Sequence, residues 1–253
     1  MANRTRRRQL ARMQLTREQL RAEQARRERR RRRVLAGVLT LVVVVVAGAI
    51  VGGTATYNHY HLTAAEKCAW VSSGSAAKPV SKPAVRKPVG RTETVALTTT
   101  QGPVTLQLDG KAATCTVASF THLARAGYFN DTPCHRLTTA SIFVLQCGDP
   151  TGKGTGGPGY GFATENTPAA GSDGNAVYKA GTVAMANSGA ANSNGSQFFL
   201  VYKDSPLPPN YTAFGTITQG MDTLQKVADA GVADGSGDGA PKLAVQLTTV
   251  TVS

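Results

Sequence analysis

Short runs of alternating apolar and polar residues fill the chain from about residue 92 onward. The range 93–108 alternates on both sides of Gln101-Gly102-Pro103, which predicts a hairpin with its turn there. Two stretches have helical spacing instead: 116–126, which Gly127 ends, and 221–230, which Gly231 ends. Further strands are predicted over 134–137, 142–147, 182–187, 197–202, 213–218 and 243–252. Many short strands with two helices indicate a mainly β domain, a closed antiparallel β-barrel capped by the helices.

One apolar run is too long for a strand. Val34–Val51 contains no charged residue, and as a helix it is about 27 Å long, close to the thickness of a bilayer's hydrocarbon core. Gly52–Thr56 can extend it, and Tyr57 and Tyr60 follow where interfacial aromatic residues lie. We therefore expect one transmembrane helix over 34–56.

Charge is concentrated on one side of this run. Residues 1–33 hold fourteen Arg and three Glu, a net of +11, whereas all 253 residues carry +13, which leaves +2 for the remainder. The positive-inside rule then predicts a single-pass protein of the cytoplasmic membrane, with the basic tail 1–33 in the cytoplasm and the C-terminal domain outside.

Two alternatives compete with this anchor. A cleaved signal peptide could use Ala47-Gly48-Ala49 as its cleavage site, although the basic region is longer than usual for such a peptide. The Arg-rich tail could bind nucleic acid, but the basicity belongs to the tail alone. We expect the membrane, through Val34–Val51 and the tail, as the partner, and no nucleic acid.

Residues 57–91 predict a linker. Lys78-Pro79, Lys82-Pro83 and Lys87-Pro88 recur among Ala, Ser and Val, a composition typical of an extended, semi-rigid chain. The linker would hold the domain, predicted over 92–253, off the membrane.

Four cysteines lie on the side predicted to be exported. An even number in an oxidising compartment favours disulfides, with three connectivities open for Cys68, Cys115, Cys134 and Cys147. Cys134 and Cys147 flank a predicted hairpin, where opposed strand positions could bridge. Free buried thiols are the alternative, and zinc is disfavoured because no C-x-x-C or H-x-x-x-H spacing occurs.

The segment Gly181–Tyr202 carries the most specific chemistry. Two apolar runs enclose ten residues of Asn, Ser, Gly and Ala, a loop that exposes its own backbone N–H and C=O groups. In the second run neighbours point to opposite faces, so Gln197 and Phe199 share one wall and Phe198 takes the other. An amide and an aromatic ring beside open backbone are suited to bind a peptide. We expect no metal and no cofactor.

A glycine-rich loop earlier in the chain, Gly152–Gly157, matches G-x-G-x-x-G. A dinucleotide site needs a helix to begin there, and Pro158-Gly159 prevents one. A phosphate-binding loop of the Walker type fails as well, because Gly154 follows Lys153 where Ser or Thr is required. The loop is therefore structural or lines a groove.

These motifs resemble the cyclophilin family of peptidyl-prolyl isomerases. Gly181–Tyr202 is similar to its signature, and three other segments match in order: Cys134–Leu137, then Phe143–Asp149 before the glycine-rich loop, then Tyr211–Gly215. The resemblance covers 92–253. It implies the cyclophilin barrel and, with the anchor, a bacterial membrane-anchored isomerase. Its partners would be proline-containing polypeptides outside the membrane, whose folding it assists.

The resemblance also implies a site. Resonance across the X–Pro amide produces a rotation barrier of about 18–20 kcal/mol, so a catalyst must favour the twisted amide. Arg136 would supply the central donor, and His135, on the opposite face, is assigned to the core. The implied catalytic residues are Arg136, Phe143, Gln146, Asn187, Phe199 and Tyr211, and the implied substrate-binding residues are Val144, Ala186, Gln197 and Leu207. Phe143, Val144, Phe199 and Leu207 would form the proline pocket.

The chain departs from the family pattern at several positions. Tyr211 stands where many members have His, Pro206 where Trp is common, and Val144 where Met is often found. The stretch from Arg136 to Gln146 is also about two residues longer than usual. We expect cyclosporin-type inhibitors to bind, but more weakly, because Pro206 offers no indole N–H.

Two other functions fit parts of the sequence. A non-catalytic chaperone or docking module could bind proline-containing segments through the same walls, although a central unpaired Arg136 would contribute little to pure binding. A membrane-surface or nucleic-acid protein could act through the Arg-rich tail. Deleting residues 1–60 separates this last hypothesis from the isomerase, because isomerase activity should survive the deletion and polyanion binding should not.

Overall fold

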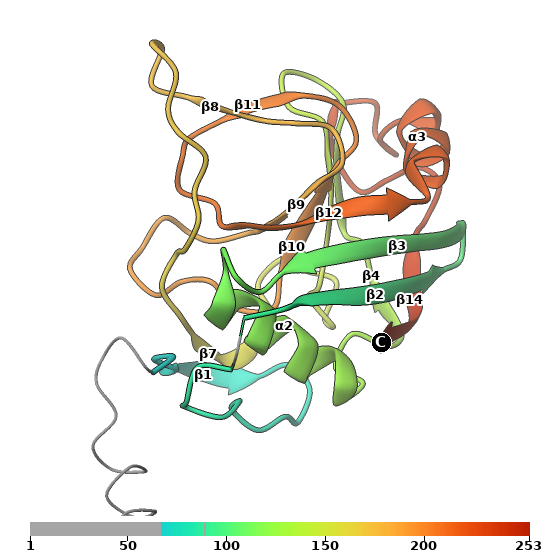
Figure 1. The fold of residues 1–253 in the computed structure, drawn as a ribbon. Coiled ribbons are helices and arrows are strands. Elements are labelled where there is room, and N and C mark those ends of the chain that lie inside the picture. Colours follow the sequence, from blue (N-terminus) through green and yellow to red (C-terminus); the bar gives the residue numbers. More distant parts are fainter. Residues whose placement is uncertain (1–66, 89) are drawn as a thin grey trace, which may run out of the picture. The chain divides into compact units, whose positions relative to one another are not determined.

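A computed structural model describes residues 67–253 of the chain, apart from residue 89. Two helices and fourteen strands lie in these residues (Figure 1). The helices are α2 (Thr114–Arg125) and α3 (Met221–Ala230). The strands are β1 (Val71–Ala76), β2 (Thr92–Thr99), β3 (Gly102–Asp109), β4 (Thr132–Pro133), β5 (Arg136–Thr138), β6 (Val144–Cys147), β7 (Pro158–Gly161), β8 (Ala176–Tyr178), β9 (Thr182–Met185), β10 (Phe198–Val201), β11 (Ser205–Leu207), β12 (Ala213–Gln219), β13 (Asp238–Gly239) and β14 (Gln246–Val252).

The predicted hairpin and both predicted helices are present. In β2 and β3 buried and exposed residues alternate, which places the apolar residues of each strand on one face. Gly102 and Pro103 belong to β3, so the turn lies one step earlier than predicted, at Thr100-Gln101. The carboxylate of Glu165 accepts hydrogen bonds from the N–H groups of Cys115 and Thr116, which stabilises the positive end of α2.

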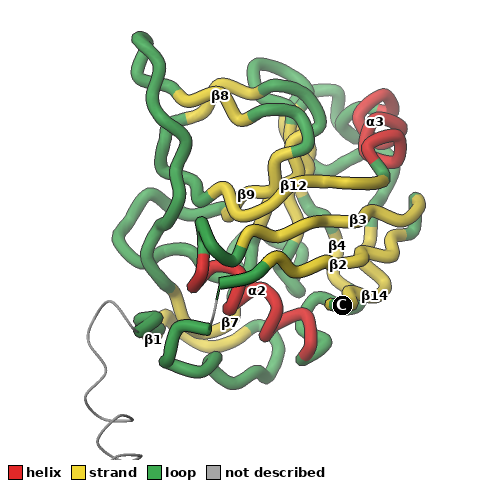
Figure 2. Tube along the Cα trace, viewed as in Figure 1, coloured by secondary structure: helices red, strands yellow, loops and turns green. Residues whose placement is uncertain are grey.

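Ten strands form one sheet in the order β13-β5-β6-β10-β9-β12-β3-β2-β14-β4, and all of its neighbours are antiparallel. The tube view shows the helices on different sides of these strands, α2 below β2 and β3 and α3 beyond β12 (Figure 2). A main core cluster fills the space that the sheet and α2 enclose. Its centre is a group of aromatic rings: Phe120, Phe129, Phe198 and Phe214.

The prediction of a closed barrel was wrong, because the sheet is open. Its end strands, β13 and β4, consist of two residues each and are not neighbours. The chain from Thr132 to Thr138 changes partner: its first part pairs with β14 as β4, and its second part pairs with β6 as β5. The structure joins Cys134 to Cys147 across this change of partner.

The predicted linker 57–91 is not an extended tether in its described part. Cys68 is joined to Cys115 of α2, and β1 pairs with β7. The Trp70 ring packs edge-on against Tyr160 and Phe162, with centroids 5.6 and 5.5 Å apart. The composition of this segment indicated an extended backbone, and an extended backbone can equally well lie along a β-strand edge and pack on a domain.

The predicted transmembrane helix over 34–56 and the basic tail lie outside the described residues. Among residues 67–88 and 90–253, no helix has the length and apolar character needed to span a bilayer.

Candidate active site

Strand register brings three of the predicted residues into one row across the sheet. Arg136 of β5 is opposite Gln146 of β6, and Gln146 is opposite Phe199 of β10. Neighbouring strands are about 4.8 Å apart, so the three side chains start from adjacent positions. As predicted, Phe198 lies in the main core and Phe199 on the opposite face. Strand alternation therefore produces a cation, an amide and an aromatic ring side by side.

Phe199 is the centre of a second apolar cluster, which we call the Phe199 cluster. Its buried members are Val144, Ala176, Tyr178, Ala184, Phe199, Val201 and Leu207, with Ile142, Ala186, Tyr211 and Ala213 packed at its border. The ring of Tyr211 meets Phe199 edge-on at 5.5 Å. Tyr178 fixes this arrangement, because its hydroxyl donates to the carbonyl oxygen of Tyr211 at 2.8 Å and accepts from its N–H at 3.2 Å.

Arg136 is held by two partners. Its Nε and Nη2 atoms donate to the two carboxylate oxygens of Asp238 at 2.7 and 2.8 Å, and Nη1 donates to Gln146 Oε1 at 3.3 Å. The hydrogen bond to Asp238 raises the pKa of Arg136, and the same bond holds the pKa of Asp238 below its usual value. A guanidinium has five N–H groups. Two of them have no partner among residues 67–88 and 90–253.

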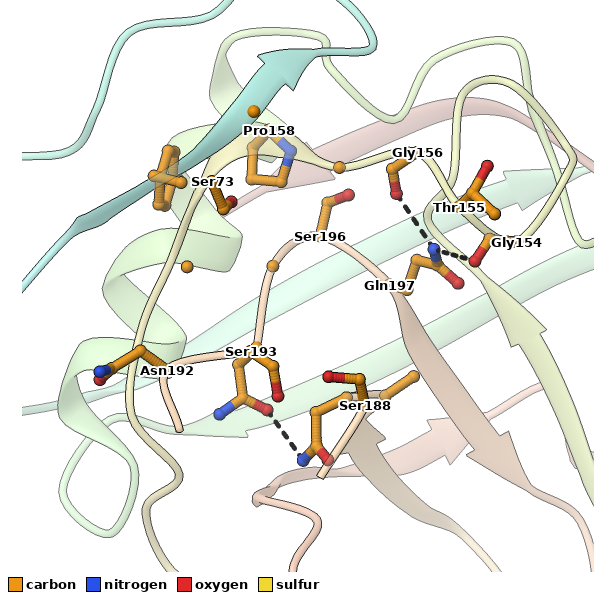
Figure 3. A pocket seen from close by; sticks show the side chains of 18 of the residues that line it. Ser73, Gly154, Thr155, Gly156, Pro158, Ser188, Asn192, Ser193, Ser196 and Gln197 are labelled. Carbon is orange, nitrogen blue, oxygen red and sulfur yellow. Dashed lines mark hydrogen bonds between the residues drawn. The ribbon is translucent and has the colours of Figure 1, made fainter. Parts of the chain in front are cut away.

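A chain of hydrogen bonds continues from Arg136 into the glycine-rich loop. Gln146 Nε2 donates to Gln197 Oε1 at 2.8 Å, and Gln197 Nε2 donates to the carbonyl oxygens of Gly154 and Gly156 at 2.9 and 3.0 Å (Figure 3). The guanidinium can only donate, so each amide must present its oxygen toward Arg136 and its nitrogen toward the loop. The chain thus has one direction and fixes both glutamine side chains.

Asp149 holds the loop from the inside. This side chain is fully buried, and it accepts hydrogen bonds from the N–H of Thr151 at 2.7 Å, the N–H of Gly156 at 3.0 Å and the Thr151 hydroxyl. Burial raises the pKa of Asp149, but these hydrogen bonds together lower it by more than burial raises it. The net shift is downward, and the carboxylate stays ionised at neutral pH. A Cβ on Gly156 would lie 2.0 Å from Asp149 Oδ1, which explains a glycine there.

Beside the Phe199 cluster lies a cavity of about 700 Å³, which we call the polar groove. No charged side chain is among its lining residues, which are mostly Gly, Ser, Thr and Asn. The lining residues come from β1, the glycine-rich loop and the loop before β10: Ser73–Ser75, Gln146, Gly154–Pro158, Tyr160, Gly161, Ala186–Ser188 and Asn192–Gln197. Gln146 and Ala186 separate the groove from the cluster, since Ala186 lines the groove and also packs on the cluster.

The other predicted site residues have different surroundings. Phe143 packs on the main core and on Tyr202, with the Lys203 ammonium 4.5 Å from its ring centroid, whereas Val144 and Leu207 lie in the Phe199 cluster. The side chain of Asn187 bridges two loops: it donates to the carbonyl of Asn210 at 2.8 Å and accepts from the N–H of Gly189 in its own loop.

Ala186 is hydrogen-bonded to the backbone of Gln197, and His135 lies apart from both apolar clusters. The N–H of Ala186 donates to the carbonyl of Gln197 at 2.9 Å. His135 is half-buried outside both clusters. Burial lowers the pKa of its imidazole, and neither ring nitrogen has a partner in the described part of the chain.

Sequence reasoning missed Asp238 and Tyr178. Asp238 lies in the glycine-rich stretch 235–239, a hundred residues after Arg136, and no local pattern connects the two. Tyr178 is in the three-residue strand β8, too short to produce a periodic signal. Only the fold places them at the site.

Comparisons with known proteins agree with this geometry. Residues 94–252 match the family described as cyclophilin type peptidyl-prolyl cis-trans isomerase/CLD. The chain is 49% identical over 191 residues to the probable peptidyl-prolyl cis-trans isomerase B of Mycobacterium tuberculosis, a match that covers 71% of this chain and 61% of the relative. The corresponding protein of Mycobacterium leprae is 48% identical, with 71% and 64% covered. The match thus spans somewhat less than two thirds of each relative.

A solved structure shows the same fold. A cyclophilin type peptidyl-prolyl cis-trans isomerase of Cryptosporidium parvum superposes with a TM-score of 0.52 at 25% identity, covering 64% of this chain and 98% of that one. A second crystal structure of that protein was determined in the presence of the dipeptide Ala-Pro, with a TM-score of 0.50 and 26% identity. The family match over most of the chain, the shared fold and the row of Arg136, Gln146 and Phe199 lead to one conclusion: this chain belongs to the cyclophilin-type peptidyl-prolyl cis-trans isomerases.

Proposed function

We propose that the chain catalyses cis-trans isomerisation of X–Pro bonds in polypeptides outside the cytoplasmic membrane and so assists their folding. The observation that carries the proposal is the position of Arg136. It has two available N–H groups in the row that leads to the Phe199 cluster.

The chemistry follows from the resonance of the X–Pro amide. As the C–N bond twists, resonance is lost, the prolyl nitrogen becomes pyramidal and basic, and its lone pair can accept a hydrogen bond. A donor fixed beside the proline ring stabilises this state more than the planar ground state, which lowers the barrier. Phe199 and its neighbours would hold the ring, and Arg136 would supply the donor. The Ala-Pro dipeptide used with the Cryptosporidium protein has the bond type that we assign to this site.

A non-catalytic proline-binding module is the alternative. The ion pair of Arg136 with Asp238 weakens the argument that an unpaired cation would be wasted on a pure binder. The isomerase proposal therefore depends on the two N–H groups that remain. The test is exchange NMR on a capped X–Pro peptide with the full-length chain in detergent micelles. We expect faster cis-trans exchange, and binding without any acceleration would support the module instead.

The location outside the membrane is supported by two features. Residues 34–51 carry no charge and follow fourteen arginines, and the domain holds two disulfides, Cys68–Cys115 and Cys134–Cys147, of the kind that persist in oxidising compartments. Protease added to intact cells should digest the domain and leave residues 1–33 protected. A freely soluble mature protein that begins after Ala49 would show cleavage instead.

Weak binding of cyclosporin-type inhibitors is part of the same proposal. Pro206 is exposed in β11 and offers neither an indole N–H nor a broad flat ring. Loss of one such hydrogen bond with its packing is worth about 1–3 kcal/mol. A low-nanomolar affinity by calorimetry would contradict this expectation.

A further inference from the structure

One wall of the polar groove comes from outside the family-matched residues 94–252. Ser73, Gly74 and Ser75 line the groove, and all three belong to β1. Figure 3 shows Ser73 next to Pro158, on the side of the cavity away from Gln197 and Gly154. The groove is therefore shaped by a segment that the isomerase domain itself does not supply.

A β-bulge shapes this wall. Ser72 pairs with Tyr160 and Ala76 pairs with Pro158, so three residues of β1 face the single residue Gly159. Such an excess bends the strand and redirects its side chains. Gly74 has φ of +68°, a left-handed conformation that favours glycine. The bulge thus turns the segment Ser73–Ser75 toward the groove.

The wall is anchored on both sides of the bulge. Before it, Cys68 is joined to Cys115, and the Trp70 indole N–H donates to the carbonyl of Ala84 at 3.1 Å. After it, the N–H of Ala77 donates to the carbonyl of Gly157 at 2.8 Å. The disulfide thus joins the segment before the bulge to α2, and the backbone hydrogen bond joins the residue after β1 to the glycine-rich loop. The bulge is a fixed part of the groove's shape.

The polar groove continues from the site of the proline. Gln146 and Ala186 border both the groove and the Phe199 cluster, so a polypeptide with its proline on Phe199 enters the groove with the residues that flank the X–Pro pair. Ser73 and Ser75 bring two hydroxyl-bearing side chains to the lining. The lining holds no charged side chain that could compensate a charge brought into it.

We infer that β1 is a specificity wall of the isomerase. It contacts the flanking segment of the substrate and favours uncharged, hydrogen-bonding side chains, such as Ser, Thr, Asn and Gln, over Asp, Glu, Lys and Arg at the position that fills the groove. This inference rests on the proposed function, because the occupant of the groove is the same polypeptide whose X–Pro bond is turned over.

The test compares long and minimal substrates with the full-length chain in detergent micelles. The long series keeps one X–Pro pair and varies each residue up to four positions away on either side, and the minimal substrate is a capped X–Pro dipeptide. Ser73→Trp fills the groove, and Val71→Trp is the control, since Val71 is exposed on the same strand outside the groove. We expect Ser73→Trp to lower kcat/KM for long peptides about tenfold, with minimal-substrate turnover changed less than about twofold.

A second variant loosens the wall rather than filling the groove. Replacing Cys68 and Cys115 together by Ser should reduce the preference for uncharged flanking residues while turnover of the dipeptide persists. The inference is overturned if Ser73→Trp changes kcat/KM equally for long and minimal substrates, or changes it for neither. It is also overturned if the wild type shows no preference among residues that flank the X–Pro pair.

Failure of the proposed function gives a different result. A wild type that accelerates exchange in no X–Pro peptide would refute the isomerase. The inference about β1 would then be tested by peptide affinity: Ser73→Trp must weaken the binding of long peptides and leave the binding of the dipeptide unchanged.

Discussion

The two halves of the site are built in opposite ways. The Phe199 cluster is apolar and lies on neighbouring strands, so strand register alone sets the positions of its side chains. The polar groove is made of loops and of the bulged strand β1, and a hydrogen-bond chain from Arg136 to the glycine-rich loop holds its shape. The difference separates two tasks. The strands hold the proline and the donor that the reaction needs, and the loops and β1 decide which polypeptide reaches them.

The largest effect should follow loss of the donor between the two halves. Arg136→Ala should lower kcat/KM by roughly 10² to 10³ while peptide affinity changes little, because the donor acts mainly on the twisted amide. Arg136→Lys should restore little, since an ammonium lacks the planar fork. Arg125→Ala is the matched control, because Arg125 is an exposed arginine of α2 that pairs with Glu93 of β2. Near-wild-type exchange rates by NMR in Arg136→Ala would remove Arg136 from its role.

A smaller effect of a different kind should come from the apolar half. Phe199→Leu should weaken peptide binding and turnover together, by about tenfold in kcat/KM, because the proline ring needs its slot in both the planar and the twisted state. Phe198→Leu is the matched control, since Phe198 is the neighbouring residue on the same strand but lies in the main core. It should lower the unfolding free energy without changing peptide affinity. Equal affinity losses in both variants would mean that the Phe199 cluster is structural only.

The loop half should respond to steric change rather than to loss of a contact. In Gly156→Ala the new Cβ would lie 2.0 Å from Asp149 Oδ1, whereas at Gly157 a Cβ meets nothing within 4 Å. We expect Gly156→Ala to lower the unfolding free energy by about 1–3 kcal/mol and Gly157→Ala to leave it nearly unchanged. Urea unfolding measures both. If both variants unfold alike, the buried Asp149 does not hold the loop.

The same division describes what the sequence could predict. Both helices and the β2–β3 hairpin follow from periodicity, and the opposite faces of Phe198 and Phe199 follow from strand alternation. The open sheet did not follow, because its end strands β13 and β4 are set by pairings with segments far away in the chain. The packing of β1 was missed because Ser, Gly and Ala give no apolar alternation. Asp238 was missed because its contact with Arg136 spans 102 residues.

The smallest expected effect concerns the ion pair that orients Arg136. Asp238 is the partner of both Nε and Nη2, but the side chains of the pair are 39% and 56% exposed. Solvent screens such a pair, so Asp238→Asn should lower kcat/KM only about two- to fivefold, with KM unchanged. Asp234→Asn, in the same loop and bonded to Ser236, is the matched control and should be neutral.

Dependence on pH and salt distinguishes orientation from a structural role. The pKa of Asp238 is lowered by its hydrogen bond to Arg136, so the pair is complete above the ordinary aspartate pKa of about 3.9 and is lost as the pH falls through the lower folded value. Between pH 5 and 8 the ratio of wild-type to Asp238→Asn activity should therefore be constant. Adding salt to about 1 M should move that ratio toward one, because an exposed pair is screened. A variant more active than wild type would show that Asp238 occupies donors that Arg136 otherwise offers to the substrate.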